Sequence, residues 1–472
     1  MSGKYQAYPV YKDSGVEWLG PIPANWQVKR VKHLTQLNPS KSEVRSRSED
    51  EHVSFIPMEA IGEQGELDAS RSRPLGEVLS GYTYVADGDV MLAKITPCFE
   101  NGKAAVATGL QQGIGFATTE VIPVRPNDPE DAKFFYYLLT SMPFKAVAEG
   151  SMYGAGGQKR VADSFVAEYH LAAPPSLERT QIAAFLDHET ARIDRLIEKQ
   201  QRLIELLKEK RQSVISHAVT KGLDPNVPMK DSGVEWLGQV PEHWDVCQFK
   251  FVTTLMQTGP FGSQLHAEDY VEDGIPLINP AHMKGGRLVP EAKASVDVET
   301  QERLSRHKLL KNDIILARRG ELGRCAVVTG ENEGWLCGTG SLKVSLSSRM
   351  VAEYCYQLIS SDGVRTELAL ESKGSTMDNL NTELLGNVRI PLPTVVEQQQ
   401  ILSHICLVEA KFNALFSRAI SQIRLLQERR TALISAAITG KIDVRNWQPN
   451  TNTQAAEPDL PMAAEQAGRY HV

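Results

Sequence analysis

The sequence lacks any long hydrophobic run and contains few cysteines. Among its 472 residues, no apolar stretch reaches the roughly 18–20 residues of a membrane-spanning helix. The first fifteen residues, MSGKYQAYPVYKDSG, contain no apolar core of a secretory signal. The six cysteines form no C-x-x-C pair, which favours unpaired thiols over disulfides or a zinc site. We therefore expect a protein of the reducing cytoplasm.

Motifs for catalysis are missing as well. The chain has no P-loop, no H-E-x-x-H pair and no G-x-S-x-G elbow. An amine methyltransferase would need a glycine-rich cofactor loop and an N-P-P-aromatic motif, but GAGGQ (154–158), NPSK (38–41) and NPAH (279–282) do not continue in that way. Glu291-Ala292-Lys293 resembles the E-x-K fragment of metal-dependent nucleases, but it lies in a turn-like VPEAKAS. We expect no catalytic residue, no metal and no cofactor bound by this chain.

The charge is distributed unevenly. The net charge of −7 is unfavourable for binding nucleic acid, since neutralising phosphates requires clustered Lys and Arg. Such clusters do occur: residues 303–324 carry seven Lys or Arg against two acidic residues, and residues 29–47 carry six against one. Clusters of this kind more often form solvated faces than ligand sites. They permit DNA binding without establishing it.

The chain contains an internal repeat. KDSGVEWLGPIPANW (12–26) and KDSGVEWLGQVPEHW (230–244) agree at eleven of fifteen positions, nine of them in an unbroken run. A shift of 219 residues aligns FVAEYHLAAPPSLERTQIAAFL (165–186) with LLGNVRIPLPTVVEQQQILSHI (384–405) without a gap. The residues between these similar ends differ strongly. The pattern predicts a duplication in which the middle of each copy has diverged.

The segment that closes each half predicts a long helix. Alternating steps of four and three residues from Ile182 reach seven apolar residues in eleven positions, and the same steps from Ile401 reach nine. A period of 3.5 residues held over about five heptads indicates a coiled-coil seam. The expected helix ends are Ser176 as a cap, Thr394 with Glu397 as a capping box, and Gly222 and Gly440 as stops.

A helix of this length with one apolar stripe needs a partner. About 44 residues form a rod of about 65 Å, which is not stable alone. The other copy is the expected partner, and because a globular segment separates the two, they can pack antiparallel with one domain at each end. The expected pairing residues are Ile193, Leu196, Leu203, Leu207, Phe412, Leu415, Leu426 and Leu433.

The middle part of each copy of the repeat is typical of a compact α/β (α+β) domain with many loops. GDVMLAKITP (88–97) and NDIILARRG (312–320) predict buried strands that end at a basic residue. HVSFIPMEAIGEQGEL (52–67) mixes short β-rich runs with turn residues. Residues 446–472 are polar and rich in Pro and Ala, which predicts a disordered tail. Two related but divergent domains held apart by a rigid spacer suit a protein that reads an asymmetric, split DNA site.

These features together resemble the specificity subunit of type I restriction–modification systems. The resemblance rests on the two SGVEWLG openings, on GAGGQKRV (154–161) and KGSTMDNL (373–380), and on the long helices that follow. It covers nearly the whole chain. It implies a non-catalytic subunit in which two target-recognition domains each read half of a bipartite double-stranded DNA site. It also implies that the helices carry two methyltransferase subunits, which assemble with restriction subunits; S-adenosylmethionine, ATP and Mg²⁺ would be used by those partners.

The expected organisation follows the repeat. Two tandem α/β (α+β) target-recognition domains are joined by two long helices packed as an antiparallel coiled coil. The expected ranges are an N-terminal segment (1–11), the first target-recognition domain (12–173), the central helix (174–222), a linker (223–229), the second target-recognition domain (230–392), the C-terminal helix (393–441) and a disordered tail (442–472).

Candidate DNA-binding residues lie at strand ends and in the glycine-rich loops. Basic side chains that follow the buried strands can reach DNA, and glycine lets a backbone approach phosphates closely. QKR in the first loop and MDN in the second show that the two loops do not contact DNA identically. The candidates are Lys94, Gly156, Gly157, Gln158, Lys159 and Arg160 in the first half, and Arg318, Arg319, Arg324, Lys373, Ser375 and Thr376 in the second.

Two alternatives stay open at this point. For a single candidate residue, a surface charge or a turn-capping group is at least as good an interpretation as a DNA contact; Arg318 and Arg319 favour the DNA contact slightly, because two adjacent arginines at a strand end are hard to justify structurally. For the whole chain, a coiled-coil adaptor without DNA binding would explain the helices, but not two divergent domains with basic patches. The aligned Trp18/Trp236 and Trp26/Trp244 are interpreted as packing anchors at the base of each domain rather than as groups that read bases.

Overall fold

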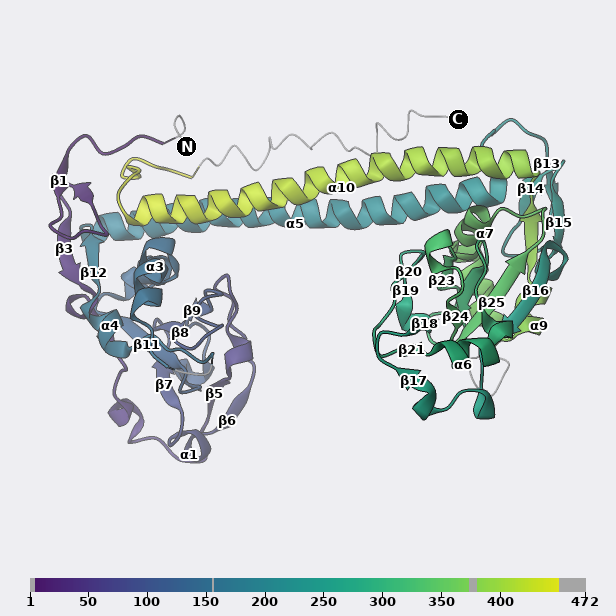
Figure 1. Ribbon diagram of the computed structural model, residues 1–472. Coiled ribbons are helices and arrows are strands. Elements are labelled where there is room, and N and C mark those ends of the chain that lie inside the picture. The colour runs from purple at the N-terminus through teal and green to yellow at the C-terminus, as the bar shows by residue number, and fades with distance from the viewer. Residues whose placement is uncertain (1–4, 155–156, 373–379, 450–472) are drawn as a thin grey trace. The chain divides into compact units, whose positions relative to one another are not determined.

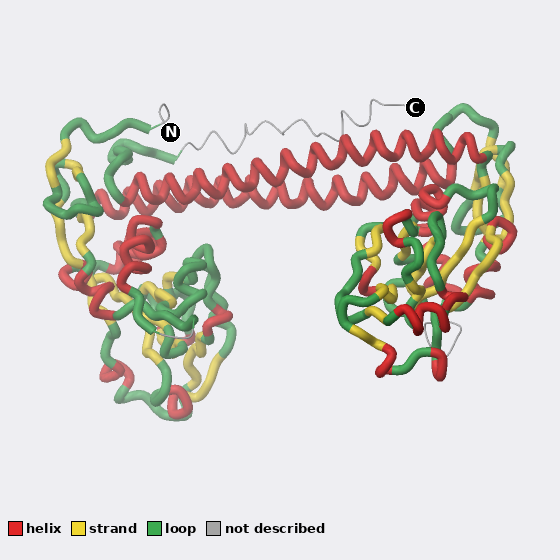
Figure 2. Tube along the Cα trace, viewed as in Figure 1, coloured by secondary structure: helices red, strands yellow, loops and turns green. Residues whose placement is uncertain are grey.

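The computed structural model describes residues 5–154, 157–372 and 380–449 (Figure 1). By contacts, these residues form two compact units. Unit 1 contains the chain up to Gln200 together with the segment from Ser421 onward, and unit 2 contains Gln201–Ile420. The boundary passes through both long helices, so each unit combines a globular part with one stretch of each helix. Figure 2 shows the mixture of short strands, short helices and loops in both.

Unit 1 contains two four-stranded sheets. One has the order β4 (Thr35–Leu37), β11 (Val121–Pro126), β8 (Val90–Ala93), β9 (Ala104–Val106), and the other β6 (Ser72–Pro74), β5 (His52–Ile56), β10 (Ile114–Ala117), β7 (Thr83–Ala86). Two-stranded ladders join β1 (Tyr11–Asp13) to β2 (Pro21–Pro23), and β12 (His170–Ala173) to β3 (Gln27–Arg30). The short helices are α1 (Leu75–Val78), α2 (Ala132–Thr140), α3 (Met142–Ser151) and α4 (Asp163–Glu168).

Unit 2 also contains two four-stranded sheets; the first has the same strand order as the first sheet of unit 1, whereas the order in the second sheet differs. Its first sheet has the order β16 (Thr253–Thr258), β25 (Ser341–Leu346), β22 (Ile314–Ala317), β23 (Cys325–Val327), and its second β17 (Tyr270–Val271), β21 (Ser295–Val296), β18 (Ile275–Ile278), β24 (Leu336–Cys337). The ladders are β13 (Met229–Asp231) with β14 (Gln239–Pro241), β15 (Asp245–Gln248) with β26 (Arg389–Leu392), and β19 (Met283–Lys284) with β20 (Arg287–Leu288). The short helices are α6 (Val298–Arg303), α7 (Ala352–Ile359), α8 (Asp362–Ser372) and α9 (Thr382–Asn387). In each unit the second sheet contains one parallel pair, β5 with β10 and β18 with β24.

The two predicted buried strands are confirmed as β8 and β22, and all their residues are buried. A buried aspartate precedes each strand. The Asp89 carboxylate accepts the Ala86 N–H at 2.8 Å, and the Asp313 carboxylate accepts the Leu310 N–H at 2.9 Å. Because these turns satisfy a backbone donor that would otherwise be buried alone, the G-D and N-D pairs read from the sequence have a structural role. The strands and helices found in both units confirm the mixed α/β character of the chain.

The long helices are α5 (Ser176–Lys221) and α10 (Val395–Ile438). The capping box is confirmed: the Thr394 N–H donates to Glu397 at 3.0 Å, and the Glu397 N–H donates to the Thr394 hydroxyl at 3.3 Å. Ser176 as a cap is wrong, since its hydroxyl donates to Asp128 at 3.0 Å and the Pro175 carbonyl accepts the first helical N–H groups. Gly222 and Gly440 follow the helix ends with positive φ, as expected.

Both helices contribute to the core of each unit. In unit 1, the first turns of α5 and the last turns of α10 share one apolar cluster, and Arg430 donates to Asp194 at 2.9 Å. In unit 2, the last turns of α5 and the first turns of α10 share another, and Arg211 lies over the Phe416 ring. None of the expected pairing residues is exposed. Ile193 and Leu433 are buried. The other six are half-buried: Leu196, Leu203, Leu207, Phe412, Leu415 and Leu426.

The expectation of a disordered tail from residue 442 is wrong for its first part. Ile442 and Val444 are buried in unit 1, and the Trp447 ring packs against Phe185 of α5. The Asp443 N–H also donates to the Gln6 carbonyl at 2.8 Å. Composition misled here because two aliphatic residues and one tryptophan suffice to anchor a short polar segment. Residues 450–472 lie outside the described residues.

The repeated opening motif attaches each globular part to the helices. Trp26 is fully buried and its indole N–H donates to Glu178 in the first turn of α5 at 2.8 Å. Trp244 is buried in the same way and donates to Glu397 in the first turn of α10 at 3.2 Å. These two tryptophans are therefore packing anchors. Trp18 is half-exposed and stacks on Tyr169.

Candidate nucleic-acid interface

In each unit, several loops meet at one edge of the first sheet. In unit 2, β16 and β22 both run antiparallel to β25, so their carboxyl ends point to the same edge. The Gly259 N–H donates to the Ser341 carbonyl and the Arg318 N–H to the Gly340 carbonyl, both at 2.9 Å. In unit 1, β4 and β8 are related to β11 in the same way. Each edge therefore brings together side chains from distant parts of the sequence.

The three candidate arginines of unit 2 have different surroundings. Arg324 donates to Glu321 at 2.6 Å and to the Pro280 carbonyl at 3.4 Å, so it holds the loop in place. Arg318 is half-buried and donates to the Leu380 carbonyl at 3.2 Å, and burial together with the charge of Arg319 lowers its pKa. Arg319 is exposed and makes no ion pair with the residues that the structure describes. Arg319 is thus the arginine most available to a ligand.

The remaining candidates of unit 2 are Lys373, Ser375 and Thr376, which lie outside the described residues. The chain resumes at Leu380, whose N–H donates to the Arg318 carbonyl at 2.8 Å. Leu380 itself thus lies at this edge, and the prediction for Lys373, Ser375 and Thr376 stays a prediction.

In unit 1, the glycine-rich loop is tied to the end of β8. The Val161 N–H donates to the Lys94 carbonyl at 3.0 Å, and the Thr96 hydroxyl donates to the Gly157 carbonyl at 2.8 Å. The Lys94 ammonium lies 3.7 Å from Asp163 and its side chain is mostly buried. The structure thus brings together Lys94 and the glycine-rich loop, which the sequence offered as separate candidates.

The polar residues of that loop divide as the arginines do. Arg160 makes a two-pronged ion pair with Glu120, and the hydrogen bond from Arg160 lowers the pKa of Glu120. Gly157, Gln158 and Lys159 are exposed. The Lys159 ammonium makes no ion pair within the described part of the chain. Gly156 lies outside the described residues. Gln158 and Lys159 remain available to a ligand.

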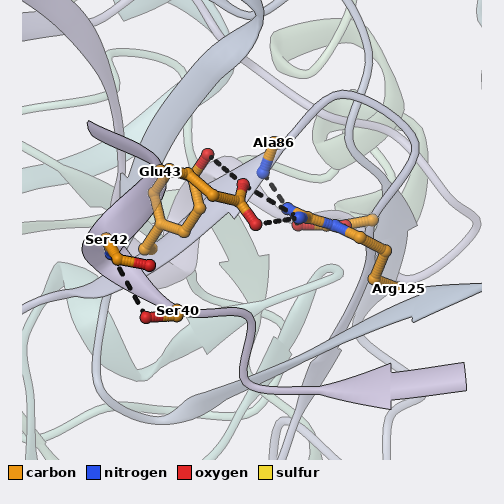
Figure 3. Close-up of polar contacts among 7 residues, drawn as sticks. Ser40, Ser42, Glu43, Ala86 and Arg125 are labelled. Carbon is orange, nitrogen blue, oxygen red and sulfur yellow. Dashed lines mark hydrogen bonds and ion pairs between the residues drawn. The ribbon is translucent and has the colours of Figure 1, made fainter. Parts of the chain in front are cut away.

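An ion-pair network around Arg125 (Figure 3) lies at the opposite end of β8, where Asp89 precedes the strand. Arg125 donates to the fully buried Asp89 at 2.6 Å and to Glu43 at 2.8 Å. These hydrogen bonds raise the pKa of Arg125. Glu43 also accepts from the Tyr84 hydroxyl, whose pKa is raised to about 12 by burial and by that carboxylate. The network holds the turn that contains Lys41, part of the basic 29–47 cluster. Sequence patterns missed it because an isolated arginine in a strand does not reveal its partners.

Other candidate chemistries find no support in the described residues. No group of three or more His, Cys, Asp or Glu side chains among them is placed to hold a metal ion. Glu291, from the nuclease-like triplet, faces His282 at 3.4 Å. A search of the described helices for one long and apolar enough to cross a membrane found none.

Comparisons with known proteins converge on one family. A family described as "Type I restriction modification DNA specificity domain" matches residues 241–424. The chain is similar to the specificity subunit of the type I restriction enzyme EcoEI from Escherichia coli, with 35% identity over 34% of this chain and 27% of that subunit. For the EcoAI specificity subunit of the same organism, identity is 28% over 58% of this chain and 46% of that subunit. The chain thus spans less than half the length of either relative.

A solved structure supports the fold. A chain from a study of complex assembly and conformational transition of the type I R-M system aligns with a TM-score of 0.66 and 16% identity. The alignment covers 89% of this chain and 99% of that chain. At this level of identity the likeness shows a common fold.

Proposed function

We propose that this chain is a specificity subunit of a type I restriction–modification system and selects the DNA sequence on which such a complex acts. Each unit would contain one target-recognition domain and read one half of an asymmetric, bipartite double-stranded site. The chain would not itself be an enzyme. Methylation of adenine, ATP use and cleavage would be the work of methyltransferase and restriction subunits in the cytoplasm, with S-adenosylmethionine, ATP and Mg²⁺ bound by those partners.

One observation carries this proposal. The first sheets of the two units have the same order of strands, yet their equivalent edges carry different groups: Lys94 and Lys159 in unit 1, Arg318 and Arg319 in unit 2. A repeat that served only for folding would have no reason to place different basic side chains at equivalent edges. Lys and Arg there can neutralise phosphates, and Arg can also contact guanine in the major groove. Different groups at equivalent edges imply different half-sites.

The paired helices would set the gap between the half-sites. In each unit, α5 and α10 share an apolar cluster, with the start of one beside the end of the other. A continuous antiparallel coiled coil built from these contacts would separate the two domains by a fixed length. The outward helix faces would then dock two methyltransferase subunits.

Selection from a random DNA library tests this function. The full-length chain, assembled with its methyltransferase subunits, is incubated with random duplexes, and the bound fraction is sequenced. We expect an enriched sequence with two short defined halves and a constant gap. Assembly with the methyltransferase without any enriched sequence would favour the coiled-coil adaptor instead.

A further inference from the structure

A bulky aromatic side chain protrudes from the edge of unit 2 that carries Arg319. Phe261 lies in the loop that follows β16, and its side chain is 63% exposed. The loop begins at Gly259, which is hydrogen-bonded to Ser341, while Arg318 is hydrogen-bonded to the adjacent Gly340. Only β25 therefore separates the Phe261 loop from the arginine loop. The stretch GPFGS, with an aromatic residue between two glycines, is a signal in the sequence that was not among the predicted sites.

The loop holds Phe261 in place rather than leaving it free. Gly259 and Pro260 are buried, and a Cβ at Gly259 would lie 1.8 Å from the Gly338 carbonyl oxygen, so only glycine fits there. Further along, Arg303 donates to the Gln264 carbonyl at 3.0 Å and pairs with Asp269 at 2.5 Å. A phenylalanine presented on a backbone anchored at both sides loses little conformational entropy when it meets a ligand.

The equivalent loop of unit 1 has a different chemistry. After β4 the chain continues as Asn38-Pro39-Ser40-Lys41, without an aromatic residue before Val44. Asn38 donates to Asp163 at 2.7 Å, the carboxylate that also pairs with Lys94. Glu43 in the same turn is held by Arg125 (Figure 3). The loop lies at the same edge in both units, polar in one and apolar in the other.

We propose that Phe261 determines part of the specificity for one half-site by contacting the methyl group of a thymine in the major groove. This inference rests on the proposed function and adds a residue and a base to it. The thymine methyl is the apolar group that the major groove exposes, and phenylalanine is among the side chains that contact it. The neighbouring Arg319 would hold the duplex through its phosphates or a guanine.

The test compares Phe261→Ala with Phe251→Ala in the assembled complex. Phe251 is the matched control: it has the same side chain, is 61% exposed and precedes β16, at the opposite end of that strand. Affinity is measured by fluorescence anisotropy on the selected duplex and on duplexes in which each thymine in turn is replaced by uracil, which removes only the methyl group. Thermal unfolding of each variant verifies the fold.

We expect Phe261→Ala to weaken binding by about tenfold or more and Phe251→Ala to leave it unchanged. Uracil at one position of one half-site should weaken the wild type and leave Phe261→Ala unaffected, and Phe261→Leu should recover part of the affinity. Wild-type affinity in Phe261→Ala, or a variant as sensitive to every uracil as the wild type, would overturn the inference. Failure of the wild type to select any sequence would instead refute the proposed function.

Discussion

At the scale of single residues, the basic groups at the two edges divide into those that hold the protein together and those that face solvent. Arg324, Arg160 and Lys94 each have a carboxylate partner within their own unit. Arg319, Gln158 and Lys159 are exposed. The sequence predicted all six as one group, because residue type and position relative to a strand do not reveal which charges are neutralised. Only the fold separates them.

This division predicts that two arginine substitutions in unit 2 affect different properties, one the DNA affinity and the other the thermal stability. Arg319→Ala should reduce the DNA affinity of the assembled complex about tenfold and leave the melting temperature unchanged, since one phosphate or base contact is lost. Arg324→Ala should lower the melting temperature, because it removes a partner of Glu321 and a donor to Pro280. Anisotropy titrations and thermal unfolding of both variants check this. A stable Arg319→Ala complex with unchanged affinity would remove Arg319 from the interface.

Glu397 predicts a dependence of stability on pH. Burial raises the pKa of this carboxyl group, but hydrogen bonds from His243, Thr394 and Trp244 outweigh it and lower the pKa from 4.5 to about 2. The folded state therefore gains stability from ionised Glu397 above pH 4.5, and this gain is lost as the pH falls from 4.5 towards 2. Because part of the side chain is exposed, we expect a contribution of roughly 2 kcal/mol.

The substitution Glu397→Gln tests the pH dependence. Its free energy of unfolding, from urea titrations between pH 6 and pH 3, should fall less steeply with decreasing pH than that of the wild type. Glu383→Gln, which changes an exposed carboxylate in α9 of the same unit, is the control and should behave as the wild type does. Equal slopes for all three proteins would show that Glu397 does not contribute in this way.

At the scale of elements, regular spacing was a better guide than composition. The 3.5-residue period predicted both long helices, and the capping box at Thr394 located one of their ends. The predicted strands β8 and β22 were found because both are short, wholly apolar and preceded by a turn. The anchored segment after Lys441 was missed, because its three apolar residues are packed by tertiary contacts that leave no periodic trace in so short a stretch.

The seam of α10 predicts a sharp difference between two leucines of that helix in unit 1. Leu433 is 1% exposed and belongs to the cluster shared with α5, whereas Leu425 is 56% exposed. Leu433→Asp buries an unpaired charge and should destabilise the fold by about 4 kcal/mol or more, whereas Leu425→Asp should change the stability by less than about 0.5 kcal/mol. Urea unfolding followed by circular dichroism measures both. Similar stability of the two variants would contradict the helix packing described for this unit.

At the scale of the whole molecule, the repeat explains why one chain contains two sheets with the same strand order, one in each unit. The similar parts are those that attach a globular part to the helices, such as Trp26 with Glu178 and Trp244 with Glu397. The divergent parts include the loops at the sheet edges. The repeat could be predicted from the sequence because it needs only aligned residues, whereas the contacts at each edge depend on loops that share no pattern. A conserved attachment with variable edges is what a reader of two different half-sites requires.

The most direct measurement of this account is a map of N6-methyladenine in the genome of cells that carry the chain with its methyltransferase subunits. We predict methylation confined to a split motif with two defined halves and a constant gap. Replacing residues 12–173 with the corresponding domain of another specificity subunit should change one half and leave the other half unchanged. Methylation at a single continuous motif, at no motif, or with both halves changed by that exchange would contradict the account.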